Sequence, residues 1–217
     1  MTYLNLEFNK IEDDGAIALA NALKINSTLT CLDLCANNIK DDGATTLANA
    51  LKSNSTLIHL DLGCNLIRND GATSLANTLK SNSTLIHLDL EYNNIKKDGV
   101  MASDIALKSN STLTYLNLCK NNIGKDGAIA LANVLKSNST LTRLYLYNNI
   151  IGDKTTIKDI ENLVERNKEI TKIRNNSMVY AILVIKKCSG LDKWMLQLIT
   201  KKICKIIGHK SWLKIKI

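Results

Sequence analysis

"KSNSTL" stands at residues 52–57 and returns at 80–85, 108–113 and 136–141, with the near copy "KINSTL" at 24–29. Each copy follows the previous one after 28 residues. A fixed period of about 20 to 50 residues is typical of proteins that are built by stacking one structural unit. The 28-residue repeat is therefore the frame in which strands and helices are assigned below.

The Asn-Ser-Thr triplet in this hexapeptide also matches the acceptor pattern for N-linked glycosylation. However, the chain begins "MTYLNLEFNK", without the apolar segment of a secretory signal, and its six cysteines form no Cys-X-X-Cys pair. Both features predict a cytoplasmic protein whose triplets carry no sugar. The longest apolar run, "MVYAILVI" at 178–185, is much shorter than the roughly 18 residues that span a bilayer.

The first half of each unit predicts a short strand. In residues 29–56, Leu32 and Leu34 alternate with polar or small residues, a period of two that is typical of a strand with one buried face. Six copies of this stretch align along the chain, at residues 3–11, 31–39, 59–67, 87–95, 115–123 and 143–151.

The second half of each unit predicts an amphipathic helix. Residues 44–52 read "ATTLANALK", with apolar residues at helical spacing on one face. An aspartate stands just ahead of each predicted helix, where its carboxylate suits the free N–H groups: Asp14, Asp42, Asp70, Asp98 and Asp126. An asparagine in each hexapeptide predicts a left-handed cap at the helix end: Asn26, Asn54, Asn82, Asn110 and Asn138. The hexapeptide is thus predicted to be a helix stop and a turn.

The combined pattern, "LxxLxLxxNxIxxDGAxxLAxxLKSNSTLT", resembles the leucine-rich repeat of the ribonuclease-inhibitor subtype, and most closely the repeats of NOD-like receptors. The resemblance implies an α/β leucine-rich-repeat solenoid, a curved horseshoe of 28-residue β-α repeats with a parallel concave sheet and convex helices. It also implies a ladder of asparagines that bond backbone groups in the turns: Asn9, Asn37, Asn65, Asn93, Asn121 and Asn149. Repeats of this kind serve inhibitors, GTPase activators, immune receptors, actin regulators and bacterial effectors, so the fold does not select a function.

Charge and pattern divide the chain in two. Residues 1–175 are predicted to form a solenoid of about six repeats, and residues 176–217 a basic amphipathic C-terminal tail or cap. Residues 1–165 hold 15 basic and 18 acidic side chains, whereas residues 166–217 hold 13 and 2. Residues 191–207 place Trp194 and aliphatic side chains on one helical face, which suits either a cap on the solenoid or an anionic membrane surface.

Two departures from the register predict local effects. The fourth copy, "DGVMASDIALKSN" at 98–110, has Ser103 and Asp104 where the others have Leu and Ala. We expect a defect in this helix, unless it shifts to bury Met101 and Ile105, because polar groups in an apolar stripe cost stability. The first copy has no preceding repeat, so we expect exposed apolar surface at that end.

Strand positions that point away from the core vary between copies and form columns of side chains, with about 4.8 Å between strands. Because Tyr and Arg are enriched in binding hot spots, we expect a protein partner on the concave face, mainly on its second half. The alternative is that the copies drifted without selection for a ligand. The candidate partner-binding residues are Tyr3, Asp33, His59, Asp61, His87, Asp89, Glu91, Tyr92, Tyr115, Asn117, Lys120, Arg143, Tyr145 and Tyr147.

The sequence contains no Gly-rich phosphate loop, nucleophile elbow or paired acid and base. We therefore predict a non-enzymatic protein with no catalytic residues, cofactor, small-molecule substrate or specific nucleic acid. Cys31, His59 and His87 share a column and have the chemistry of zinc ligands, but a flat column does not supply tetrahedral geometry, so no metal site is predicted.

Two other functions remain open. One is an effector or receptor-like fragment whose basic tail associates with a membrane. The other is a GTPase-activating protein similar to the Ran activators, which would use Asn and Arg on the strand-to-helix loops. Those loops hold a single arginine, Arg68.

Overall fold

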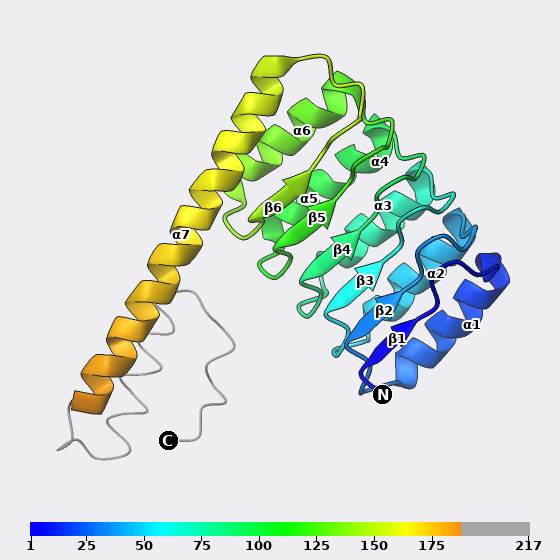
Figure 1. Cartoon of the computed structure of the whole chain (residues 1–217), viewed down its shortest axis with the longest axis horizontal. Coiled ribbons are helices and arrows are strands. Elements are labelled where there is room, and N and C mark those ends of the chain that lie inside the picture. The colour runs from blue at the N-terminus through cyan, green and yellow to red at the C-terminus, as the bar shows by residue number, and fades with distance from the viewer. Residues whose placement is uncertain (188–217) are drawn as a thin grey trace. The chain divides into compact units, whose positions relative to one another are not determined.

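The computed structural model describes the backbone of residues 1–187 and the side chains of residues 1–102 and 106–177. The chain divides into two compact units, Met1–Asn167 and Lys168–Ile217. The first unit alternates short strands with helices (Figure 1). The strands are β1 (Tyr3–Asn5), β2 (Cys31–Asp33), β3 (His59–Asp61), β4 (His87–Asp89), β5 (Tyr115–Asn117) and β6 (Arg143–Tyr145). The helices are α1 (Glu12–Ile25), α2 (Asp41–Leu51), α3 (Asn69–Thr78), α4 (Lys97–Met101), α5 (Ser103–Ser109), α6 (Gly124–Ser137) and α7 (Lys154–Lys187), and the last of these continues into the second unit.

The six strands form one parallel sheet in the order of the sequence. Every strand pairs with the next at a shift of 28 residues, so that Leu4 lies beside Leu32 and Leu116 beside Leu144. Figure 1 shows the strands in one layer and helices α1 to α6 in a second layer behind them. This arrangement confirms the predicted α/β solenoid. The core lies between the layers, where Leu32, Leu60 and their equivalents are buried.

The first asparagine ladder is present as predicted. Buried Asn65 donates from Nδ2 to the carbonyl oxygens of Leu34, Leu62 and Gly63 at 2.9, 3.1 and 2.9 Å. Its Oδ1 accepts from the backbone N–H groups of Asn37 and Ile39 at 3.1 and 2.9 Å. Three of these five hydrogen bonds therefore join two neighbouring repeats, and two stay within the turn that contains Asn65.

The prediction of left-handed caps at the asparagines of KSNSTL was wrong. Asn110 has φ −73° and ψ 130°, which is extended backbone, and none of the five asparagines has a positive φ. Asn54 instead donates from Nδ2 to the Leu23 carbonyl at 2.8 Å and accepts the Leu57 N–H at 2.8 Å. The same pair of bonds recurs one repeat apart at Asn82, Asn110 and Asn138. KSNSTL thus builds a second asparagine ladder, at the end of the helices.

This second ladder ends in a different residue type. Arg166 stands 28 residues after Asn138 and donates to the carbonyl oxygens of Leu135, Lys136 and Asn138. The neighbouring Asn167 is buried and donates to the Leu141 carbonyl at 2.9 Å. A guanidinium group therefore satisfies the carbonyls at the end of α6, which need partners outside the helix.

The helix starts also differ from the prediction. Asp14 and its equivalents lie inside the first turn, where they suit the helix dipole but form no capping bond. For α2 and α3 the preceding repeat supplies the cap instead. Asp13 accepts the Lys40 and Gly43 N–H groups at 2.8 and 3.0 Å, and Asp41 caps α3 in the same way.

The fourth copy contains the expected local defect, because its helix is broken at Ala102 into α4 and α5. The alternative in which the helix shifts to bury Met101 is wrong, since this side chain is 53% exposed. The side chains of Ser103, Asp104 and Ile105 lie outside the described residues.

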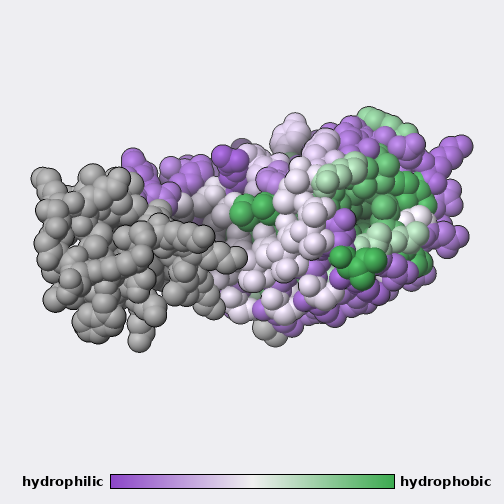
Figure 2. All heavy atoms as spheres, turned by 90° about the horizontal axis from the view of Figure 1, so that it is seen from below, coloured by the Kyte–Doolittle hydropathy of each residue, from purple (hydrophilic) through white to green (hydrophobic). Residues whose placement is uncertain are grey.

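Apolar surface gathers at the end of the first unit that carries β1 and α1, on the right in Figure 2. Met1, Tyr3, Phe8 and Ile25 are exposed there, and Leu4 is only partly buried. This is the apolar exposure that we expect for a first repeat without a preceding neighbour.

Candidate functional site

The side of the sheet that faces away from the helices, here called the strand face, holds the predicted columns of side chains. The strand register brings together one column of Tyr3, Cys31, His59, His87, Tyr115 and Arg143, and a second of Asn5, Asp33, Asp61, Asp89, Asn117 and Tyr145. Neighbouring members of a column come from neighbouring repeats, so each column contains one residue from every strand.

Four rings form a continuous run across β3 to β6. The ring centroids of His59 and His87 are 5.2 Å apart, and His87 stacks on Tyr115 at 3.7 Å with an interplanar angle of 10°. Tyr115 contacts Tyr145 of the other column at 5.4 Å. Arg143 lies in register with Tyr115 and is exposed. We call these five residues the aromatic run.

Burial keeps the centre of the aromatic run uncharged. It lowers the pKa of His87, and the nearby His59 lowers this pKa further. Burial also raises the pKa of Tyr115 to about 12, with Asp89 as the next cause. The stacked pair is therefore a neutral imidazole on a neutral phenol at pH 7, a flat apolar surface with polar edges.

A polar cluster lies beside the aromatic run. Lys120 forms an ion pair with Glu91 at 2.9 Å and lies 5.8 Å from the centre of the Tyr92 ring. Asn117 donates from Nδ2 to Asp89 and to Glu91 at 2.9 and 3.0 Å. The bonds from Lys120 and Asn117 lower the pKa of Glu91. This cluster is largely satisfied by its own members, so fewer of its groups are free to bind a partner.

The acidic column has a structural role that the sequence did not reveal. Asp33, Asp61 and Asp89 each accept, through Oδ1, the backbone N–H of the residue two positions later, at 3.0, 2.8 and 2.8 Å. Asn5 and Asn117 do the same. These bonds end each strand in a local turn, which short polar side chains favour.

Backbone geometry also fixes the positions of Tyr92 and Lys120. Both lie in the left-handed region, with φ of 53° and 52°, in a column whose members all share it: Phe8, Ala36, Cys64, Tyr92, Lys120 and Asn148. A left-handed residue that is not glycine costs about 1 kcal/mol or more and persists only where the surroundings impose it. Here the surroundings are the turn that each repeat makes after its strand.

Two further predicted residues are not members of the aromatic run. Tyr3 is on β1, at the opposite edge of the sheet from β6. Tyr147 follows β6 and is 73% exposed. Together with Tyr145 it borders a cavity beside β6, whose aliphatic lining sequence reasoning missed.

Asp61 carries an unfavourable charge in the folded state. Burial, opposed by the bond from the Gly63 N–H and reinforced by Asp89 and Asp33, raises the pKa of Asp61 from 3.8 to about 6. A raised carboxyl pKa means that ionisation opposes folding. The contribution of Asp61 therefore destabilises the fold above pH 6 and disappears as the pH falls below 4.

We expect Asp61→Asn to stabilise the protein at pH 7.5, because the amide keeps the Oδ1 acceptor and removes the charge. After a discount for solvent exposure, the gain is about 1 kcal/mol, or roughly 2 to 4 °C in Tm. The gain should vanish near pH 4, as measured by thermal unfolding across the pH range. The reverse change, Asn117→Asp, should lower Tm at pH 7.5. A gain from Asp61→Asn that does not depend on pH would contradict this account.

Comparison with known families identifies the repeat. The model of a family described as "Leucine Rich repeat" matches residues 1–20, 26–48, 53–76, 81–102 and 109–132, together more than half of the chain. The chain belongs to the leucine-rich repeat family.

Solved structures agree with this assignment of the fold. The leucine-rich repeat protein is similar to a structure described as "Leiomodin-1 Actin-Binding Site 2 (ABS2)", with 22% identity, a TM-score of 0.56, and coverage of 83% of this chain and 88% of that one. It is also similar to the tropomodulin C-terminal domain of Caenorhabditis elegans, with 12% identity, a TM-score of 0.62, and coverage of 76% and 98%. A comparison with curated protein sequences gives no significant match.

Three further observations concern this leucine-rich repeat protein. Within the described residues, no three His, Cys, Asp or Glu side chains are arranged to hold a metal ion. Burial and the adjacent Cys64 raise the pKa of Cys35 to about 12, so its thiol stays protonated at neutral pH. None of the helices in residues 1–187 has the length and apolarity that crossing a bilayer requires.

Proposed function

We propose that this leucine-rich repeat protein is a non-enzymatic interaction module that binds a protein partner on its strand face, the concave side of the expected horseshoe. The aromatic run carries the proposal. Its members come from four adjacent repeats, and its centre is a stacked, uncharged pair next to an exposed arginine. Aromatic side chains and arginine contribute most of the energy at the centre of protein interfaces.

The proposed contact zone runs from β4 to the residues after β6. Tyr145 and Tyr147 are 46% and 73% exposed, so a partner that covers them removes apolar surface from water. Arg143 offers a planar set of donors for a carboxylate of the partner. His59, Asp61, Asp89 and the Glu91 cluster would form the border of the zone, and Tyr3 and Asp33 would contact only a partner that extends along the sheet.

We infer that the repeats are of the ribonuclease-inhibitor subtype and closest to those of NOD-like receptors, because each of the first five units combines a three-residue strand with a helical segment in 28 residues. The structures that share the fold support a role in binding proteins. Actin is included in the test below because the leiomodin structure is described as an actin-binding site.

Proteins captured by the intact chain should be lost from a variant with Tyr115→Ala, Arg143→Ala and Tyr147→Ala. Binding of purified monomeric actin is measured in parallel. The control replaces three exposed lysines at the helix ends, Lys24, Lys52 and Lys80, by alanine. With both variants folded by circular dichroism, we expect at least a roughly 100-fold loss of affinity for the first and little change for the control. Equal capture by the two variants would contradict the strand-face proposal.

The alternatives have their own tests. The basic segment 191–207 lies outside the described residues, and its association with an anionic membrane is measured by liposome binding of the intact chain and of a chain lacking residues 177–217.

A GTPase-activating role depends on Arg68, which borders a cavity that Asp13, Asp41 and Asp42 also line. These carboxylates would repel nucleotide phosphates. Stimulated GTP hydrolysis by any small GTPase would overturn the non-enzymatic proposal.

A further inference from the structure

The sheet and the helix layer end at different places. Inside the array each helix stops and the chain returns as a strand: α6 ends at Ser137 and β6 begins at Arg143. One repeat later the equivalent of Ser137 is residue 165, but α7 continues as helix through this position to Lys187. Within the described residues, the helix layer therefore gains α7, whereas no strand follows β6 in the sheet.

Among the residues that the structure describes, the edge of β6 has backbone donors without partners. Inside the array, Leu118 N–H donates to Tyr145 O at 2.9 Å and Lys120 N–H to Tyr147 O at 2.8 Å. Ile123 N–H donates to Oδ1 of the ladder residue Asn149 at 3.3 Å. The equivalent donors one repeat later are the N–H groups of three residues, none of which has an acceptor in the described part of the chain: Leu146, Asn148 and Ile151.

One of these donors is buried. Ile151 is only 6% exposed, and buried N–H groups in native proteins are almost always paired. The pattern of the array shows what would pair it: an asparagine Oδ1 from one strand further on. In the described part of the chain, the β6 edge therefore lacks the particular hydrogen-bond acceptors that a following repeat supplies elsewhere in the array.

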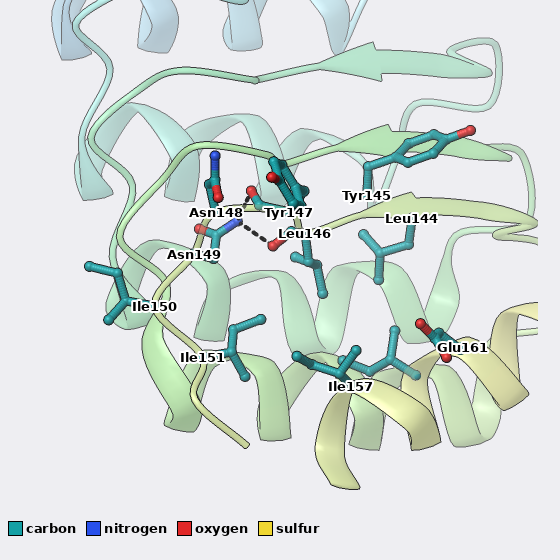
Figure 3. A pocket seen from close by; sticks show the side chains of 11 residues that line it. Leu144, Tyr145, Leu146, Tyr147, Asn148, Asn149, Ile150, Ile151, Ile157 and Glu161 are labelled. Atoms are coloured by element: carbon teal, nitrogen blue, oxygen red, sulfur yellow. Dashed lines mark hydrogen bonds between the residues drawn. The ribbon is translucent and has the colours of Figure 1, made fainter. Parts of the chain in front are cut away.

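A cavity of about 390 Å³ lies beside the same edge, within the range of ligand pockets. Figure 3 shows Leu144, Leu146, Ile151 and Ile157 around the space between the last strand and the start of α7. One repeat earlier, the strand that follows β5 supplies Leu144 and Leu146, which pack against the core. The cavity is thus the place of two leucines from a seventh strand.

We propose that the β6 edge binds an extended peptide as a seventh parallel strand, with two aliphatic residues two positions apart in the cavity and an asparagine three positions later on the Ile151 N–H. The backbone of the peptide would accept from Leu146 and Asn148. Strand addition of this kind takes affinity from main-chain bonds and specificity from pockets for alternate side chains. The five strand pairs already present fix the register and the direction.

A peptide fits this edge better than a second copy of the chain. β1 carries the same pattern in Leu4, Leu6 and Asn9, but it comes with α1 and the second ladder. In that ladder, Asn54 donates to the carbonyl of Leu23 in the preceding repeat. In a copy added after β6, Asn26 would take the equivalent place and would have to donate to the Leu163 carbonyl. Leu163 lies within α7, where its carbonyl belongs to the helix. A strand without a helix meets no such conflict.

The probe is a labelled peptide with the sequence of residues 85–95, "LIHLDLEYNNI", added to the full chain. We expect saturable binding that weakens at least about 10-fold when the peptide carries Leu88→Ser and Leu90→Ser. Asn93→Ala in the peptide should also weaken it. Hydrogen exchange at the amides of Leu146, Asn148 and Ile151 should slow in the complex. Binding that leaves these three amides unchanged would overturn the proposal.

Two protein variants place the peptide. Ile157→Asp puts a charge in the cavity, at a side chain that is 38% exposed. The control, Ile129→Asp, puts a charge on α6 outside the cavity lining, at a side chain that is 39% exposed. Affinity should fall at least about 10-fold for the first and stay unchanged for the second. Equal affinity of the two variants for the peptide would contradict the proposal. A dimer of the chain that Ile157→Asp dissociates, but that the peptide does not, would contradict it as well. A chain with Tyr115→Ala and Arg143→Ala should keep the peptide, which separates this site from the strand-face function.

Discussion

Asn65→Ala is expected to cost about 4 kcal/mol of the free energy of unfolding, more than any other single change that we consider. The alanine removes five hydrogen bonds, of which three reach Leu34, Asn37 and Ile39 in the preceding repeat and two stay in the turn of Asn65 itself. Most of these groups are buried, so each lost bond costs more than an exposed one. Urea unfolding followed by circular dichroism measures the effect.

Asn9→Ala is the matched control. Asn9 holds the same place in the first repeat, but it is exposed and donates only to the Leu6 and Glu7 carbonyls of its own turn. We expect a loss of about 1 kcal/mol or less, because water replaces these bonds. Similar losses for Asn9→Ala and Asn65→Ala would show that the ladder acts within each turn and does not join the repeats.

Gly71→Ala is expected to destabilise the protein by about 2 to 3 kcal/mol, although alanine is the better helix former. A Cβ at Gly71 would lie 2.8 Å from Asp41 Oδ1, 2.9 Å from Ile67 Cγ2 and 3.0 Å from Ala44 Cβ. The methyl group would separate α2 from α3 and displace the carboxylate that caps α3. The urea midpoint measures this loss as well.

Gly15→Ala tests whether the cause is the contact between repeats. A Cβ at Gly15 would contact only the side chain of Ile11, at the end of the array, and no cap from a preceding repeat. We therefore expect little net change, since the gain in helix propensity, of about 1 kcal/mol, offsets the rearrangement of Ile11. A stabilised Gly71→Ala variant would contradict the close packing of α2 on α3.

The strands, their register and the first asparagine ladder could be predicted because each repeats the same local signal six times. The neighbours on the strand face followed from that register, so the proximity of His59, His87 and Tyr115 was foreseeable. Which rings stack was not, because this depends on side-chain rotations. The structural role of Asp61 was not foreseen, because its varied column suggested display, whereas an Asp or Asn there also ends the strand in a turn.

Interactions between repeats were the hardest to foresee. KSNSTL resembled a helix stop, and nothing within the hexapeptide shows that its asparagine bonds a carbonyl 31 residues earlier. The cavity beside β6 does have a signal in the sequence. At 164–169, where KSNSTL would recur, the chain reads "VERNKE", so the turn that returns a strand is absent and α7 continues.

The capping residue one repeat upstream changes character along the chain: Asp13, Asp41 and Asn69 are followed by Lys97 and Lys125. An ammonium group cannot accept an N–H, so the first three junctions between repeats are capped by an oxygen of the preceding repeat, whereas the next two use ion pairs, Lys97 with Asp126 at 3.9 Å and Lys125 with Asp153 at 3.3 Å. In a one-dimensional array, stability is the sum of such nearest-neighbour terms, and opening is easiest where they are smallest. Salt screens exposed ion pairs of this kind, so the half that carries the aromatic run is joined in part by contacts whose strength depends on ionic strength, whereas the first three junctions rely on backbone caps.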